Sequence, residues 1–389
     1  MRYVQLDSLR GVAACAVVLC HATNVLPGVY DDPDQLWWLT QTPLGLLRAG
    51  HAAVIFFFVL SGFVLALPFL EGPVSYPSFL ARRICRIWIP YATAMVVAVC
   101  CAICFYPNEV PGLSRWANRS LALPDASLIA DHLLLVGTFP NGTYNPVVWS
   151  LVHEMRISLV FPVLVLVLRL GAWWRVLGAA VALSVASLVV ERLPIGADSN
   201  DLLMTLHYAG LFVLGMVLAR DMPKIQACYA RFPVWTKALL WLFAFVCYGH
   251  QAWIFSGSRL QHVPLYRDGL IAVGVSLFII FALSPSRLSA WLQGRPFVFL
   301  GQISYSVYLF HAVILLSLVH SFFGRVPLGL LWIATVLLTI GIATLAYHLI
   351  EVPSIRLGRV FRFGQKLANT QLVRHSNGGE RTTGTSTVG

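Results

Sequence analysis

Apolar stretches as long as a membrane-spanning helix follow one another along almost the whole chain, and they constrain the fold more than any other feature. A helix needs about 20 mainly apolar residues to cross the hydrocarbon core of a bilayer. Such stretches lie near residues 9–27, 48–70, 88–106, 148–168, 172–190, 203–220, 236–255, 267–284, 297–320 and 328–350. The sequence therefore predicts an all-α fold, a polytopic bundle of about ten transmembrane helices.

Composition agrees with a chain that is solvated mainly by lipid. Of the 389 residues, 58% are hydrophobic and 11% are charged, whereas soluble domains contain about 25% charged residues. The first stretch has the basic start of a signal peptide, but His21 interrupts it and no small-residue cleavage site follows. We therefore expect an uncleaved first span, and we expect any chemistry to take place between the spans.

The formal net charge of +11 reflects topology rather than a nucleic-acid partner. With a cytoplasmic N-terminus, Lys and Arg concentrate in the inner segments 71–87, 220–237, 285–296 and 351–389, while the outer loops are richer in Asp. This is the positive-inside bias of membrane proteins. We therefore predict cytoplasmic termini and a location in the inner (cytoplasmic) cell membrane, in contact with its lipids. Cys101 and Cys104 have CxxC spacing but no second pair, so no metal site is predicted.

Arg10 and His21 stand out in the first span because the residues between them are all small or apolar. Eleven residues leave about 20° after three full helical turns, so both side chains lie on one face, about 16 Å apart along the axis. Arg10 is either a topological anchor or a functional cation. A histidine inside a span is costly and titrates near neutral pH, which favours a functional role for His21 over a packing role.

A basic cluster precedes the third span in the segment SYPSFLARRICRIWIPY. Arg83 and Arg86 are three residues apart and therefore share a helix face, with Arg82 beside them. The cluster satisfies the positive-inside rule, but guanidinium groups also bind phosphate through paired hydrogen bonds. The spacing leaves both interpretations open.

Glu154 lies about six residues inside the outer end of the fourth span, at the depth predicted for His21 in the first span. A carboxylate within a span normally faces the protein interior. If the two side chains meet, Glu154 would orient the imidazole and raise its basicity. The alternative is a structural pair of Glu154 with Arg156 or His153.

The ninth span contains a polar stripe in the segment GQISYSVYLFHAVILL. Its members lie near one another on the helical wheel: Ser304, Tyr305, Tyr308 and His311. They either form hydrogen bonds between helices or line a cavity for a polar substrate. The long outer loop near 107–147 is rich in turn residues and is expected to act as a lid over an outward-facing site.

Six of these segments together resemble a known family. LDSLRGVAACAVVLCH, FFFVLSGFVL, RRICRIWIPY, WSLVHE, SYSVYLFH and YHLIEVP occur in the order found in the acyltransferase-3 family. These are integral-membrane enzymes that O-acylate extracytoplasmic glycans and some antibiotics. The resemblance covers residues from about 3 to 354 of the sequence.

The resemblance implies roles for individual residues. Arg10 and His21 match the family's Arg-ten-His motif, in which the histidine is essential. Arg83 and Arg86 match its cytoplasmic paired-arginine motif, and Glu154 matches its fourth-span acid. The transmembrane acyltransferase domain is then expected over 1–354, followed by a basic, disordered cytoplasmic tail at 355–389. One departure is Arg156, where the family usually has an apolar or aromatic residue.

A reaction follows from this resemblance. Acyl-CoA, with acetyl-CoA as the expected donor, would bind from the cytoplasm through the phosphate-binding arginines, and its thioester would reach His21. With Glu154 beside it, His21 would act as the general base for a hydroxyl of a glycan or glycosylated metabolite; an acyl-histidine intermediate is the alternative. The expected donor-binding residues are Arg10, Arg82, Arg83 and Arg86, and the expected substrate-binding residues are Trp149, Ser304, Tyr305, Tyr308 and His311. Among the latter, Ser304, Tyr305 and His311 would either bind the acceptor or stabilise the oxyanion.

A transporter or flippase for acylated or glycan substrates, without chemistry of its own, is the competing class. Such a protein would also carry polar residues within its spans. Transporters are often built from repeated halves with interrupted helices, and no internal repeat is visible here. The sequence therefore favours an enzyme.

Overall fold

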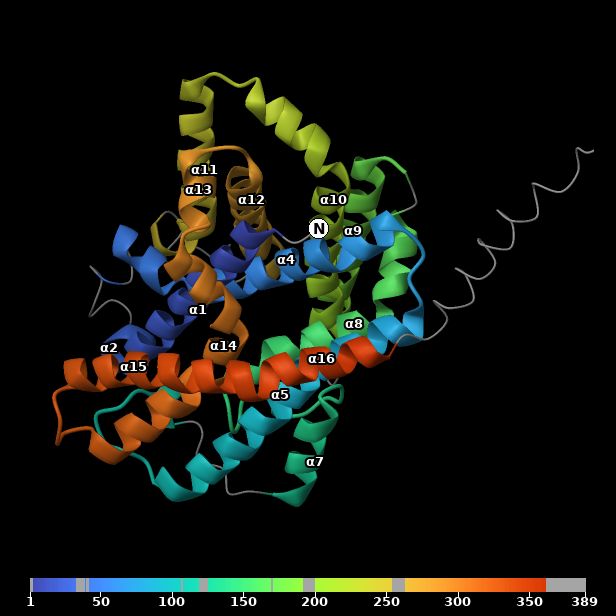
Figure 1. The fold of residues 1–389 in the computed structure, drawn as a ribbon. Coiled ribbons are helices and arrows are strands. Elements are labelled where there is room, and N and C mark those ends of the chain that lie inside the picture. Colours follow the sequence, from blue (N-terminus) through green and yellow to red (C-terminus); the bar gives the residue numbers. More distant parts are fainter. Residues whose placement is uncertain are drawn as a thin grey trace, which may run out of the picture.

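All regular secondary structure in the described part of the chain is helical (Figure 1). The computed structural model describes residues 3–32, 39, 42–105, 108–118, 125–168, 171–191, 200–253 and 263–361. The predicted all-α fold is thus confirmed. Most of the tail predicted to be disordered, residues 362–389, lies outside the described residues.

The helices follow the apolar stretches of the sequence. Their bounds are α1 Val4–Asn24, α2 Pro27–Tyr30, η2 Pro43–Arg48, α4 Gly50–Glu71, α5 Tyr76–Phe105, α6 Arg115–Asn118, α7 Ala126–Leu134, α8 Val148–Leu168, α9 Trp173–Glu191, α10 Asn200–Ala230, α11 Val234–Trp253, α12 Pro264–Leu283, α13 Arg287–Leu292, α14 Arg295–Phe322, α15 Leu328–Ala346, η5 Tyr347–Glu351 and α16 Val352–Val360. Among the described residues, nine helices are long and apolar enough to cross a bilayer, and α11 contains a shorter apolar stretch. The prediction of a polytopic membrane bundle is confirmed.

Glycine pairs allow the central helices to approach closely. α1 packs along α14, and a Cβ atom on Gly11 would lie 2.7 Å from the backbone nitrogen of Gly301. α4 packs along α10 in the same way, with Gly215 against the backbone of Val59. Because lipid tails are as apolar as leucine, close van der Waals packing over small residues is what holds such helices together. These contacts fix α1, α4 and α14, which carry most of the polar side chains of interest.

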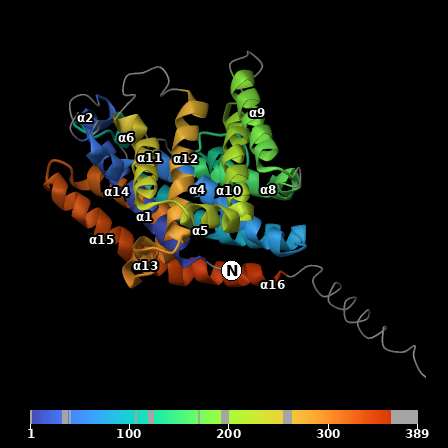
Figure 2. The same ribbon diagram turned by 90° about the horizontal axis from the view of Figure 1, so that it is seen from above.

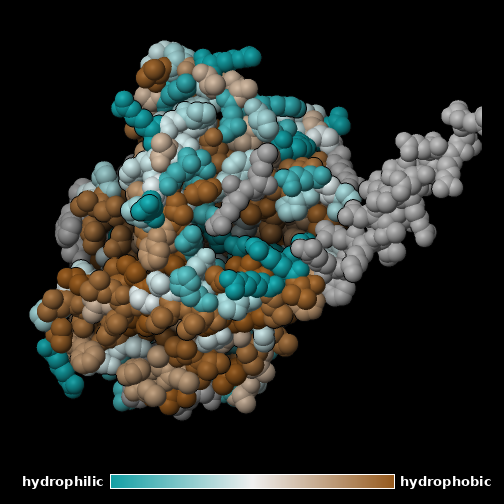
Figure 3. Space-filling model, viewed as in Figure 1, coloured by the Kyte–Doolittle hydropathy of each residue, from teal (hydrophilic) through white to brown (hydrophobic). Residues whose placement is uncertain are grey.

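A belt of exposed apolar side chains covers the outside of the bundle. On α15, Leu330, Ile333, Leu337 and Leu345 are each more than half exposed, with exposed fractions of 56 to 65%. Figure 3 shows apolar surface over the band formed by α15 and its neighbours. An exposed belt of this kind is the surface expected to face lipid.

The start of α1 and the helix α16 lie on the same face of the molecule (Figure 2). Tyr3 and Asp7 line the same cavity as Ile355 and Arg356 of α16. This helix continues to Val360, past the expected domain boundary at residue 354, and packs against α5. We call this side the α16 face and the opposite side, which carries the end of α1, the His21 end.

Candidate active site

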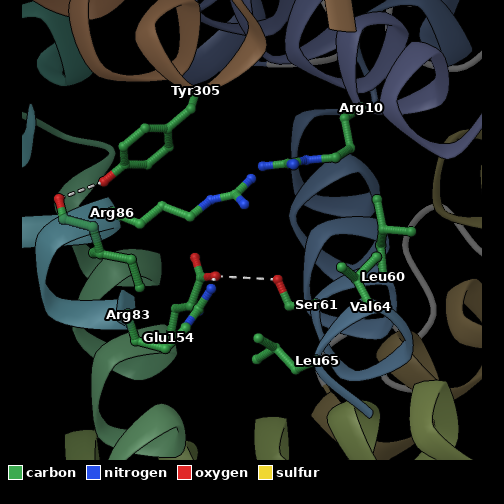
Figure 4. Close-up of a pocket in the computed structure, with 10 residues that line it drawn as sticks. Arg10, Leu60, Ser61, Val64, Leu65, Arg83, Arg86, Glu154 and Tyr305 are labelled. Carbon is green, nitrogen blue, oxygen red and sulfur yellow. Dashed lines mark hydrogen bonds and ion pairs between the residues drawn. The ribbon is translucent and has the colours of Figure 1, made fainter. Parts of the chain in front are cut away.

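A polar cavity lies inside the bundle between α1, α4, α5, α8 and α14 (Figure 4). We call it the arginine cavity, and its lining consists of Arg10, Leu60, Ser61, Val64, Leu65, Arg83, Arg86, Ile87, Glu154 and Tyr305. The structure thus brings together the first-span arginine, the paired arginines and the fourth-span acid. Arg82 is not among the lining residues, because its side chain is exposed and its Nε donates to the carbonyl of Ser78.

Glu154 is held by Arg83 and Ser61. Nη2 of Arg83 lies 2.8 Å from Oε1 of Glu154, and Oγ of Ser61 donates to the same oxygen at 3.1 Å. Arg83 also donates to Oγ of Ser158 from Nε and Nη2. Arg83 therefore reaches from α5 to α8 and has most of its hydrogen-bonding capacity occupied.

The predicted contact between Glu154 and His21 is wrong. Glu154 shares the arginine cavity with Arg10, which lies about 16 Å from His21 along α1. The physical reason is charge: a carboxylate in a low-dielectric interior is stabilised far more by a permanent guanidinium cation than by a neutral imidazole. The alternative partners predicted for Glu154 are also engaged elsewhere, since Arg156 pairs with Asp201 at 2.7 Å and His153 contacts Thr205 at 2.8 Å.

Arg10 and Arg86 lack such partners. Neither forms an ion pair or a hydrogen bond with another residue in the described ranges. Figure 4 shows the two side chains extending toward one another across the cavity. Two guanidinium groups in a partly buried cavity without a paired carboxylate create a strong preference for a bound anion.

The arginine cavity overlaps two further cavities. Toward the His21 end it shares Arg10, Ser61, Glu154 and Tyr305 with a second cavity, which is also lined by Phe57, Phe58, Ser150, Ser304 and Tyr308. Toward the α16 face it shares Arg10, Val64 and Arg86 with a third cavity of about 460 Å³, which we call the vestibule. The three cavities share lining residues and follow one another from the α16 face to Tyr308, and we call this series the cavity tract.

The polar stripe of α14 lies along this tract. Tyr305 donates to the carbonyl of Ile87 at 2.8 Å, and Ser304 donates to the carbonyl of Gly301 at 2.8 Å. The hydroxyl of Tyr308 lies 2.7 Å from Oγ of Ser150. Tyr305 and Tyr308 therefore join α14 to α5 and α8, whereas the Ser304 hydroxyl bonds within α14. All three also line the cavities, and a polar substrate there stays a prediction.

His21 is paired with His311 rather than with a carboxylate. Nδ1 of His21 lies 2.9 Å from Nε2 of His311, and Nδ1 of His311 lies 2.9 Å from the carbonyl oxygen of Val307. A carbonyl only accepts, so His311 carries its proton on Nδ1 and its Nε2 accepts from Nδ1 of His21. This network leaves Nε2 as the basic nitrogen of His21.

The same network revises the role expected for His311. Its side chain is completely buried, and both ring nitrogens are already engaged. This favours a positioning role toward His21 over contact with an acceptor.

Part of the long outer loop covers His21, as expected of a lid. The ring of Trp116 in α6 lies 4.8 Å from the imidazole of His21, measured between centroids. Ser114 Oγ donates to the carbonyl of Asn24 at 2.5 Å, which ties this part of the loop to the end of α1. His21 is thus enclosed between α1, α14 and α6.

Trp149 lies at a separate pocket on the outside of the tract. This pocket has a volume of about 430 Å³ and is lined by Phe139, Pro140, Asn141, Gly142, Thr143, Pro146 and Trp149. The indole ring lies 6.4 Å from the ring of Phe58, which lines the second cavity. Trp149 therefore stands between the outer pocket and the tract.

The sequence interpretation missed a buried charge cluster around Asp268. This carboxylate is fully buried and lies 2.7 Å from Nε2 of His51, 3.2 Å from Nε2 of His207 and 2.7 Å from Nε of Arg267. The cluster ties α4, α10 and α12 together. A signal was available, because Asp268 falls inside the predicted span 267–284 and a carboxylate there needs a partner.

The fold and the cavity tract define the class: a polytopic membrane protein with an arginine-lined polar site between its helices. The sequence profile of the family described as an acyltransferase domain matches residues 3–348. The chain belongs to this family, acyltransferase-3, and is a membrane acyltransferase of the kind that includes O-acetyltransferases. No solved structure matches it.

The relatives named below are each 26% identical to the chain. Acyltransferase MdmB of Streptomyces mycarofaciens is aligned over 81% of this chain and 80% of its own length. A protein of Staphylococcus aureus (strain COL), provisionally named an O-acetyltransferase, is aligned over 91% of this chain and 57% of its own. YrhL of Bacillus subtilis, provisionally named a peptidoglycan O-acetyltransferase, is aligned over 90% of this chain and 55% of its own length. The chain thus spans little more than half the length of these last two relatives.

Proposed function

We propose that this protein transfers an acetyl group from cytoplasmic acetyl-CoA to a hydroxyl of an extracytoplasmic glycan or glycosylated metabolite. The observation that carries the proposal is the tract of three overlapping cavities. It contains Arg10 and Arg86, which have no ion-pair partner among the described residues, and it reaches Tyr308, next to His311. An acyl donor made in the cytoplasm and an acceptor outside require such a route across the bundle.

The donor's phosphates are assigned to Arg10 and Arg86. Both are cations of the arginine cavity that lack carboxylate partners among the described residues. Arg83 contributes charge to the same cavity, but its hydrogen bonds go to Glu154 and Ser158. Guanidinium groups bind phosphate oxygens through paired, charge-assisted hydrogen bonds. The pantetheine arm would extend from this point past Tyr305 and Tyr308.

His21 is assigned as the general base. Its Nε2 would accept the proton of the acceptor hydroxyl while the hydroxyl oxygen attacks the thioester carbonyl carbon. The carbon–sulfur bond then breaks, and the CoA thiolate leaves with the proton that His21 returns. His311 supports this role because it accepts from Nδ1 of His21 and so keeps Nε2 basic. An ester and free CoA are the products.

The acceptor is proposed to be a glycan hydroxyl that approaches from the side of the outer pocket. The provisional name of the YrhL relative, a peptidoglycan O-acetyltransferase, supports an envelope glycan. Because some members of the family acylate antibiotics, a glycosylated metabolite is the second candidate acceptor. The ring of Trp149 is partly buried and lines the outer pocket, and an aromatic ring of this kind suits the apolar face of a sugar.

The experiment that tests this function uses the purified protein in lipid nanodiscs with acetyl-CoA labelled in the acetyl group. Envelope glycans and extracts of secreted metabolites serve as acceptors, and both free CoA and labelled product are measured. We expect turnover with an acceptor present and a loss of about 10²–10⁴-fold in the variant His21→Ala, with its thermal stability unchanged. Binding of acylated product without CoA release would instead identify a carrier.

A further inference from the structure

The vestibule is bounded on one side by α16, the helix that follows the last span. It is lined by Tyr3, Leu6, Asp7, Arg10, Val64, Leu67, Arg86, Gly301, Gln302, Ser304, Tyr347, Glu351, Val352, Ile355, Arg356 and Arg359. Four of these residues are arginines and two are acids. The opening of the tract at the α16 face is therefore positively charged.

Arg356 and Arg359 form the outer cationic pair of the vestibule. They are three residues apart on α16, so their side chains lie on one face of the helix. Both are exposed, and neither makes an ion pair with any residue that the structure describes. The nearby acid Glu351 is buried, and its Oε2 accepts from Oγ of Ser306 at 3.0 Å.

α16 is held in place against α5, the helix that carries Arg86. Gly358 packs so closely that a Cβ atom there would lie 3.1 Å from Cα of Arg82 and 3.2 Å from Cβ of Cys85. Ser354 Oγ donates to the carbonyl of Glu351 at 2.8 Å, which reinforces the first turn. The packing of α16 against α5 therefore fixes how far the backbone of the outer pair lies from that of Arg86.

The cations of the tract thus fall into two groups, a deeper one and an outer one. The phosphates of CoA also fall into two groups: a diphosphate joined to the pantetheine arm, and a monophosphate on the 3′ position of the ribose. The arm must point toward His21, so the diphosphate lies deeper than the nucleoside. The deeper group, Arg10 and Arg86, then matches the diphosphate, and the outer pair matches the remaining phosphate.

We propose that Arg356 and Arg359 bind the ribose 3′-phosphate of the acyl-CoA donor at the mouth of the vestibule. This inference rests on the proposed function. It makes α16 part of the donor site and predicts that the enzyme distinguishes CoA from its 3′-dephospho form. The exposed arginines of α16 are therefore more than a topological signal.

The test compares acetyl-CoA with 3′-dephospho-acetyl-CoA in nanodiscs of phosphatidylcholine. For the wild type, we expect kcat/KM to be at least about tenfold higher for acetyl-CoA, since a charge-assisted contact is lost in the analogue. In Arg356→Ala/Arg359→Ala, kcat/KM for acetyl-CoA should fall to the value for the dephospho analogue, which should itself remain unchanged. The matched control is Arg287→Ala, an exposed arginine outside the three cavities, which should keep the wild-type preference.

Other outcomes overturn the inference. If the double variant keeps the preference for the 3′-phosphate, the arginines do not bind it. If both donors lose activity equally, and the loss depends on adding phosphatidylglycerol to the nanodisc, the pair binds lipid headgroups. If the wild type uses both donors equally well, only this inference fails. If the wild type consumes neither acetyl-CoA nor its dephospho analogue, the proposed function is wrong, and the inference that rests on it is wrong as well. Thermal unfolding midpoints and the binding of adenosine 3′,5′-bisphosphate, compared with ADP, extend the test to variants with low turnover.

Discussion

Arg83 and Glu154 form an ion pair inside the bundle, with Nη2 of Arg83 2.8 Å from Oε1 of Glu154. The pair separates the roles of two arginines that the sequence presents as equivalent. Arg83 is bound to the acid of α8, whereas Arg86 faces Arg10 across the cavity (Figure 4). We therefore assign charge balance and structure to Arg83, and donor binding to Arg86.

Substitution of Arg86 should weaken donor binding with little effect on stability. In Arg86→Ala, the KM for acetyl-CoA should rise about ten- to a hundredfold, because one charge-assisted contact is lost, while the acceptor KM stays unchanged. Lysine should restore only part of the affinity, since an ammonium group cannot form the paired contact. Steady-state kinetics with each substrate varied in turn checks this, and full rescue by lysine would contradict it.

Arg83→Ala should behave differently. Removal of one partner of a buried ion pair leaves an uncompensated charge and costs about 3–5 kcal/mol in the free energy of unfolding. The double variant Arg83→Met/Glu154→Gln should recover part of this loss. Thermal unfolding in detergent measures both, and an unchanged midpoint in Arg83→Ala would show that the pair carries no structural role.

His311 should act on kcat through His21. In His311→Ala, the His311 acceptor for the Nδ1 proton of His21 is lost, so kcat should fall about 10²-fold or more while the KM for acetyl-CoA changes little. His311→Gln, whose side-chain oxygen can still accept from Nδ1, should retain more activity. Equal losses in the two variants, or a rise in KM alone, would point to packing or substrate contact instead.

The spans and the polar positions were predictable from the sequence, but their partners were not. Chain length and hydropathy locate a helix, and helical periodicity places Arg10 and His21 on one face. Depth within a span does not define how helices tilt and cross, so the predicted meeting of Glu154 with His21 failed. Arg83 reached Glu154 because α5 and α8 lie side by side there, which one sequence cannot reveal.

Two further residues illustrate the same limit. His311 was recognised as part of a polar stripe, yet its contact with His21 joins positions 290 residues apart. Asp268 gave a clear signal as an acid within a span, but its partners His51 and His207 come from two other helices. A polar residue within a span therefore predicts that a partner exists, but the sequence does not identify that partner.

The Asp268 cluster should matter for stability. Asp268→Asn removes the carboxylate shared by Arg267 and two histidines, and we expect a loss of about 3–5 kcal/mol in the free energy of unfolding. The matched control is Asp221→Asn, which removes a partly exposed ion pair with Arg220 and should cost about 1 kcal/mol or less. Comparable unfolding midpoints for the two variants would contradict a central role of the cluster.

The outer loop should lose stability in mild acid because of His132 in α7. Its imidazole is buried beside Phe139 and Tyr144, and burial lowers its pKa from the usual 6.5 to about 4. The unfolded state takes up a proton first as the pH falls, so stability is lost between about pH 6.5 and 4, by at most about 3 kcal/mol. Hydrogen exchange of residues 126–134 across this pH range measures the effect, which should disappear in His132→Gln. Exchange independent of pH would refute this.

The sidedness of the reaction tests the central claim most directly. Membrane vesicles with the predicted cytoplasmic side facing outward receive labelled acetyl-CoA outside and the acceptor glycan in the lumen. The account predicts labelled glycan in the lumen and free CoA outside, with both absent in His21→Ala. Label that reaches glycan only when donor and acceptor share one compartment would contradict transfer through the cavity tract.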